Sequence, residues 1–129
     1  MTWWSTNKKP RKAIGEARKT QNRVEEGFYP TFEKMVLAFG GWPWHLTVAQ
    51  RSQPGRPDYS IYFDGSYAEV ELKARNPATN RVGKLTAEQI TWGERAKRAG
   101  VDWQHFTLPD DWERVEKWLE QKTGRRVIR

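Results

Sequence analysis

The sequence predicts an α/β domain in which helices flank a mixed β-sheet, with elements in the order α-β-β-β-α-β-α. Two alternating runs that meet at Asp64-Gly65 are typical of a β-hairpin. A helix-like segment then separates the hairpin from another strand-like run, as expected for a crossover within one sheet. Apolar residues at helical spacing precede and follow these strands.

The first predicted helix ends at Gly40-Gly41, a pair typical of a helix C-terminus. Pro30 is expected in its first turn, where proline is tolerated. The alternative is a longer helix from about Asn22 that is kinked or broken at Pro30. The apolar stripe of this helix has i, i+3, i+4, i+7 spacing and comprises Phe32, Met35, Val36 and Phe39.

Residues 1–20 are polar and basic, and we expect them to form a flexible arm ahead of a domain of residues 21–129. A helical turn is expected near Ala13–Lys19. Two interpretations of the arm stay open, namely contact with nucleic-acid phosphates and a solvated terminus. Its basic residues are Lys8, Lys9, Arg11, Lys12, Arg18 and Lys19.

Three strands are expected next, at Trp44–Gln50, Tyr59–Phe63 and Tyr67–Ala74. The last two form the hairpin, which folds Asp58 back beside the third strand. Side chains on a strand repeat with period two, so alternate residues share a face. The charged residues on one face of the third strand are Glu69, Glu71 and Lys73.

The remaining elements are a helix, a strand and a helix. Thr86 and Gln89 form a T-x-x-Q capping box that opens a helix ending at Ala99, before Gly100. A fourth strand is expected at Val101–Leu108. A last helix is expected to be capped by Asp110, with Glu113 three residues on, and to end before Gly124; its apolar stripe is Trp112, Val115 and Leu119.

The composition is strongly basic. The 129 residues include 23 Lys+Arg against 16 Asp+Glu, a net charge of +7, and the pI is about 9.9. This balance favours nucleic acid as a partner; the alternative is a soluble protein with a basic tail. The chain has no cysteine, which excludes disulfides and thiolate zinc sites and suits a reducing cytoplasm. No apolar run reaches the roughly 20 residues of a membrane span, so no membrane partner is expected.

Asp58, Glu71 and Lys73 form the candidate active site. Two carboxylates can hold a divalent cation, and the backbone carbonyl of Leu72 lies between the last two residues and can complete the protein ligands. A lysine beside them can steer or activate a water molecule. The alternative interpretation of E-x-K is a solvent-facing ion pair on a half-buried sheet.

The ordered motifs resemble the PD-(D/E)XK nuclease superfamily, and more narrowly its VRR-NUC and Holliday-junction-resolvase-like branch. The resemblance covers roughly residues 20–120, and it is the order of the motifs that is specific. The matching pieces are Gly55-Arg56-Pro57-Asp58, Glu71-Leu72-Lys73-Ala74, Gly83-Lys84-Leu85-Thr86 with Gln89 and Trp92, and Ala99-Gly100.

The resemblance implies a restriction-endonuclease-like core and DNA cleavage that depends on Mg²⁺ or Mn²⁺. It implies that Asp58 and Glu71 are the metal carboxylates and Lys73 the catalytic lysine. It also implies a glutamate on the first helix that reaches the metal, for which we rank Glu26 above Glu33; Glu25 is a further candidate. A site role is likewise implied for Gln89, which can coexist with its role in the capping box.

Several other residues are candidates for binding nucleic acid. Arg51, Arg56, Arg75, Arg81 and Lys84 lie in loops that border the predicted site, where phosphate contacts are expected. Trp42 and Trp44, which flank Pro43, are the tryptophans best placed to stack on unpaired bases, with core packing as the alternative. Glu69 is expected to be solvated, and His45 and His105 are expected to be packed or surface side chains, although His45 can also serve as an auxiliary base.

These observations favour a small metal-dependent DNA endonuclease. The absence of a separate DNA-reading domain suits a structure-selective activity on branched or flapped DNA, or nicking, as in phage or mobile-element DNA processing. Resolvase-like members act as dimers, so a homodimer is a further expectation, without a dimer face readable from the sequence. The alternative is a non-catalytic nucleic-acid-binding protein that keeps the fold, and RNA is not excluded as the substrate. The expected location is the cytoplasm, or the host cytoplasm if the protein is phage-encoded.

Overall fold

The computed structural model describes residues 8–47 and 53–126, with side chains from Arg23 onward. The predicted order of elements is confirmed. None of the helices in the described part of the chain combines the length and the apolar character that a membrane span needs. The elements are α2 (Lys8–Ala38), β1 (Trp42–His45), β2 (Tyr59–Phe63), β3 (Ser66–Ala74), α3 (Ala87–Arg98), β4 (Asp102–Leu108) and α4 (Trp112–Thr123).

The four strands form one mixed sheet in the order β1-β2-β3-β4. β1, β2 and β3 run antiparallel to one another, and β4 is parallel to β3. The hairpin between β2 and β3 turns at Gly65, whose φ of +74° is the left-handed conformation that glycine tolerates best. The crossover through α3 then brings β4 alongside β3 in parallel, which gives the mixed sheet that was predicted.

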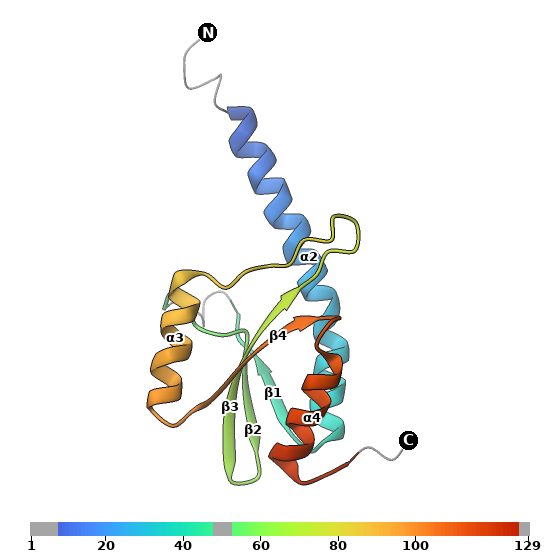
Figure 1. Cartoon of the computed structure of the whole chain (residues 1–129), viewed down its shortest axis with the longest axis vertical. Coiled ribbons are helices and arrows are strands. Elements are labelled where there is room, and N and C mark those ends of the chain that lie inside the picture. Colours follow the sequence, from blue (N-terminus) through green and yellow to red (C-terminus); the bar gives the residue numbers. More distant parts are fainter. Residues whose placement is uncertain (1–7, 48–52, 127–129) are drawn as a thin grey trace.

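Helices cover both faces of the sheet (Figure 1). α2 and α4 pack on one face of the sheet. There Phe32, Val36 and Leu119 join apolar residues of β2, β3 and β4 in the hydrophobic core. α3 packs on the other face, which we call the α3 face. A Cβ added to Gly93 would lie 2.9 Å from the Trp103 indole, so the absence of a side chain lets α3 approach β4 closely.

α2 is one continuous helix that begins earlier than expected, and the position predicted for Pro30 was wrong. Pro30 lies inside the helix rather than in its first turn. An interior proline costs about 3 kcal/mol; burial of Phe32, Val36 and Phe39, at about 1.5–3 kcal/mol each, outweighs this cost. Residues 8–20 of the expected arm belong to α2, so the helical turn expected near Ala13–Lys19 is part of a longer helix. The first half of α2 projects beyond the sheet (Figure 1), and residues 1–7 lie outside the described part.

Two further boundaries differ from those expected. β1 is Trp42–His45 rather than Trp44–Gln50, because its register ends where His45 pairs with Tyr59, the first residue of β2. Residues 48–50 lie outside the described part. The N-cap position of α4 is Asp111 rather than Asp110. The Asp111 side chain makes no hydrogen bond to the helix; its carboxylate accepts one from the Thr107 backbone N–H at 2.7 Å.

Candidate active site

The carboxylates of Asp58 and Glu71 lie next to each other at the start of β2. Tyr59 pairs with Val70, so continuing the register by one residue places Asp58 opposite Glu71. The Leu72 backbone N–H donates to Asp58 Oδ2 at 2.9 Å, which fixes the position of the Asp58 carboxylate. Both side chains are only 3% exposed. The hairpin therefore brings together the two acids that the sequence predicted for one site.

Glu71 is held in an environment that disfavours its charge. Burial raises its pKa to about 9, helped by the neighbouring Asp58 carboxylate and, to a lesser degree, by Glu25; Lys73 acts in the opposite direction. Glu71 Oε2 is buried and receives no hydrogen bond from any residue that the structure describes. Two carboxylates this close, with an oxygen lacking a donor, need either a shared proton or a cation between them.

Lys73 forms an ion pair with Glu71 of this pair. Its Nζ lies 3.8 Å from Glu71 Oε1, and its side chain is only 12% exposed. It shares the α3 face with Glu71, as the strand period predicted. The Lys73 ammonium is thus held against the Glu71 carboxylate, two residues away on the same strand.

His105 of β4 pairs with Glu71 and shares its face of the sheet. Burial and then the Lys73 charge lower the pKa of His105, so its imidazole is neutral at neutral pH. Its Nε2 is buried and makes no hydrogen bond within the described part. From the sequence, His105 was expected only to be a packed or surface residue, because it is the parallel register of β3 and β4 that brings it beside the site.

Gln89 joins α3 to the site through both ends of its amide. Its Nε2 donates to Glu71 Oε1 at 2.9 Å. Its Oε1 accepts from the Thr86 N–H at 2.9 Å, while its own N–H donates to Thr86 Oγ1 at 3.1 Å. Gln89 therefore makes both the capping-box contact and the site contact that the sequence suggested for it.

The glutamate of α2 that is electrostatically coupled to Glu71 is Glu25. Its charge contributes to the raised pKa of Glu71. Glu26 is exposed. Glu33 lies beside Tyr59 instead, because the pKa of the Tyr59 phenol is raised first by burial and then by the charge of Glu33. The structure therefore favours Glu25, the further candidate, over both Glu26 and Glu33. Glu25 precedes the buried Phe32 by seven residues, or two helical turns, and so shares its helix face; this signal was missed because the helix was expected to begin at Pro30.

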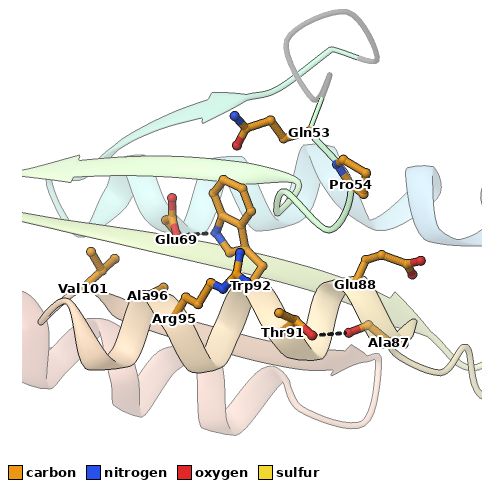
Figure 2. A pocket seen from close by; sticks show the side chains of 10 residues that line it. All are labelled: Gln53, Pro54, Glu69, Ala87, Glu88, Thr91, Trp92, Arg95, Ala96 and Val101. Atoms are coloured by element: carbon orange, nitrogen blue, oxygen red, sulfur yellow. Dashed lines mark hydrogen bonds between the residues drawn. The ribbon is translucent and has the colours of Figure 1, made fainter.

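Glu69 is buried, which overturns the expectation that it is solvated. Trp92 Nε1 donates to its Oε1 at 2.9 Å and the Tyr67 hydroxyl to its Oε2 at 3.0 Å. The reason is that α3 packs over this end of β3. A pocket of about 670 Å³ lies there, and Figure 2 shows Trp92 rising from α3 into it toward Gln53 and Pro54.

Gly55 allows the loop before Asp58 to pack on the first turn of α3. Its φ is +86°, and an added Cβ would overlap the Glu88 carbonyl oxygen. A second hollow, of about 280 Å³, is lined by Gly55, Arg56, Thr86 and Gln89 at the N-terminus of α3. Arg56 Nε is buried there without a hydrogen-bond partner among the described residues.

The other basic residues predicted to contact phosphates differ in their surroundings. Arg75 donates to both carboxylate oxygens of Asp110, at 2.8–3.2 Å, and to Asn80, so its guanidinium joins two loops. The Arg75 guanidinium is therefore engaged by protein groups in this structure, and its role as a phosphate contact stays a prediction. Arg81 and Lys84 are exposed, and Arg51 lies outside the described residues.

The protein oxygens at the site are those of Asp58 and Glu71 and the Leu72 carbonyl. Within residues 23–47 and 53–126, no group of three or more histidine, aspartate or glutamate side chains is arranged to hold a metal ion. Comparisons with protein-family models, with curated proteins and with solved structures give no match. The function of this protein is therefore inferred from its own residues.

Proposed function

We propose that this protein is a metal-dependent DNA endonuclease of the PD-(D/E)XK type, built on a restriction-endonuclease-like core. The observation that carries the proposal is the buried pair of Asp58 and Glu71, with the Lys73 ammonium 3.8 Å from Glu71. A structural ion pair does not require a second buried carboxylate, and two carboxylates facing phosphate repel DNA unless a cation is present.

The oxygens at the site suit a hard divalent cation, Mg²⁺ or Mn²⁺. Glu71 Oε2 lacks a donor among the described residues, and the Glu71 carboxyl is coupled to that of Asp58. A strand residue directs its N–H and C=O to the same side, so the Leu72 carbonyl faces the side on which its N–H binds Asp58. Asp58, Glu71 and Leu72 would hold the cation, with water as the remaining ligands. A bound cation would lower the pKa of a coordinated water and neutralise charge on the phosphate.

Each protein side chain then has a distinct task. Lys73 orients the attacking water or binds a non-bridging phosphate oxygen through its ammonium. Gln89 holds Glu71 Oε1 at 2.9 Å, which leaves Oε2 as the oxygen available to a cation. Glu25 is the α2 glutamate assigned to the supporting role, because its charge acts on Glu71 whereas Glu26 is exposed.

Phosphate contacts would come from the loops around the site. Arg56 and the N-terminus of α3 line the same hollow, where an anion is favoured by the helix dipole as well as by the guanidinium. Arg81 and Lys84 are exposed and add salt-dependent contacts. The proposed activity is structure-selective cleavage of branched or flapped DNA, or nicking.

The test is cleavage of labelled linear duplex, single-stranded, flapped and four-way-junction DNA in Mg²⁺, Mn²⁺ or EDTA. Asp58→Ala and Lys73→Ala should abolish cutting. Glu26→Ala, which removes an exposed glutamate, should leave cutting at the wild-type level and serves as the matched control. Cutting that persists in EDTA or in the Lys73→Ala protein would contradict the proposal. Salt-sensitive DNA binding without cutting in any metal would instead support a non-catalytic binding protein.

A further inference from the structure

Four aromatic side chains form a continuous row across the α3 face of the sheet. Trp42 and Trp44, two residues apart on β1, stack with ring centroids 6.3 Å apart and planes 16° from parallel. Trp42 contacts Tyr62 of β2 at 5.4 Å, and Tyr62 contacts Tyr67 of β3 at 5.3 Å. The register places all four on one face, since Trp42 pairs with Tyr62 and Tyr62 with Tyr67. We call these four residues the aromatic row.

The aromatic row is unusually open to solvent. Trp42 is 62% exposed, Trp44 44% and Tyr62 38%, so no helix in the described part of the chain covers them. Rings of this size are normally buried, and exposed clusters of them mark binding surfaces. Because the rings already pack against one another, the surface is preformed and binding would order few side chains.

The row adjoins the candidate active site. Trp44 pairs with Ser60, which is two residues after Asp58 on the same face. Beneath the row, Ser60 Oγ lies 3.0 Å from the Tyr67 hydroxyl, which donates to Glu69 Oε2. A strand of DNA that crosses Asp58 and Glu71 can therefore continue onto the rings without leaving this face of the sheet.

We propose that the aromatic row binds unpaired nucleotides of a single DNA strand next to the cleavage site, by stacking bases on Trp42 and Trp44. This deepens, and rests on, the proposed nuclease function, because it makes DNA with a single-stranded segment the preferred substrate. Every base has a π-face, so stacking on tryptophan needs no particular sequence. The row contains no charged residue, and the net charge of +7 favours a polyanion over a neutral or basic partner.

A second copy of the chain is the main competing occupant, and the edge strand argues against it. β1 is one of the two edge strands of the sheet and is only four residues long. Pro43 lies in the middle of it and has no N–H to donate to an added strand. Short edge strands that carry proline are poor templates for strand addition, whereas the ring faces stay open to a ligand.

The test measures binding rather than cleavage, in EDTA, by the fluorescence anisotropy of labelled oligonucleotides. A single strand, the matching duplex and a duplex with a single-stranded flap are compared. The Trp42→Ala/Trp44→Ala double variant should bind the single strand and the flap about 10-fold or more weakly, with duplex affinity within about 2-fold of wild type. Trp42→Phe/Trp44→Phe should retain most of the affinity because it keeps a ring at each position. Leu37→Ala is the matched control, since it removes an apolar side chain that is 59% exposed on α2.

Salt dependence separates stacking from phosphate contacts. The double alanine variant should show the wild-type slope of log K against log salt, whereas Lys84→Ala should show a shallower slope. Thermal unfolding of each variant confirms that it is folded.

Equal losses on duplex and single strand, or no loss, would overturn the proposal, as would a wild-type dimer that the double variant converts to monomer in sedimentation. Ring-dependent binding to the single strand without any cleavage would uphold the aromatic row as a single-strand surface and overturn only the nuclease function.

Discussion

Gln89 Nε2 donates a hydrogen bond to Glu71 Oε1 across 2.9 Å, and so joins the first turn of α3 to the acidic pair on the sheet. The same side chain closes the capping box of α3 through its Oε1. One residue thus connects the stability of a helix end with the orientation of a candidate metal ligand. Because of this double role, substitution of Gln89 should affect both the helix cap and the site, whereas substitution of Thr86 should affect the cap alone.

Gln89→Ala should lower both stability and cleavage. We expect a loss of about 1–2 kcal/mol in the free energy of unfolding, because the capping box and the bond to Glu71 are both removed. Cleavage should fall further than stability explains, since Glu71 Oε1 loses its donor. Thr86→Ala is the matched control: it removes only the bond from the Gln89 N–H. Urea unfolding and cleavage rates of the two variants separate the two roles, and equal rates would refute the site role of Gln89.

Glu71→Gln should stabilise the protein at neutral and alkaline pH in EDTA. The pKa of Glu71 is raised to about 9 by burial and by Asp58, from an ordinary value of 4.5. Unfolding therefore releases the proton between these two values, and the stability of the wild type should decrease as pH rises through this window. The substitution removes the ionisable group, so its advantage should be small near pH 4.5 and grow to the order of a few kcal/mol by pH 9.

Denaturant unfolding of the wild type and of Glu71→Gln across this pH range measures the difference directly. A wild-type stability that rises between pH 5 and pH 8 relative to the variant would contradict the raised pKa. Saturating Mg²⁺ should shrink the difference, because a bound cation stabilises the ionised wild-type carboxylate but not the amide.

Gly55→Ala should disrupt the site through the backbone. The added Cβ would overlap the Glu88 carbonyl oxygen at a φ of +86°, so the loop that leads to Asp58 must move away from α3. We expect a loss of about 2–3 kcal/mol in stability and strongly reduced cleavage. Gly65→Ala is the control, with a φ of +74° but no described atom within 4 Å of the added Cβ. It should cost only about 1–2 kcal/mol and spare cleavage; equal damage to activity would contradict a role for the packing of Gly55.

Glu25→Gln should reduce metal-dependent cleavage about 10-fold or more, as removal of groups that support metal ligands usually does. The reason is that the charge of Glu25 acts on Glu71. Glu26→Gln, one residue further along the helix and exposed, should cut at the wild-type rate. The Mg²⁺ concentration that gives half-maximal cleavage should rise for Glu25→Gln alone. A shift for Glu26→Gln instead would restore the ranking expected from the sequence.

The order of the elements and the central acid pair were predictable from local patterns. The Asp64-Gly65 turn and the strict alternation along β3 set the hairpin register, which brings Asp58 opposite Glu71 and puts Lys73 on the same face. The capping box at Thr86 and the glycine at the end of α4 marked helix boundaries to within one residue. These features depend on contacts between residues that are close in sequence or paired by one turn.

Features that depend on packing between layers were not predictable in this way. The face of α2 that packs on the core determines that Glu25, and not Glu26, is coupled to the site. Because the helix was expected to begin at Pro30, the sequence did not show which face Glu25 occupies. The packing of α3 on the sheet buries Glu69. The guanidinium of Arg75 donates hydrogen bonds to the Asp110 carboxylate of another loop. The sequence by itself therefore determined the hairpin and the acids that it carries, because period and turn chemistry are local. The tertiary structure decided which helix residues meet those acids and which aromatic rings stay exposed, because both depend on how helices pack across the sheet.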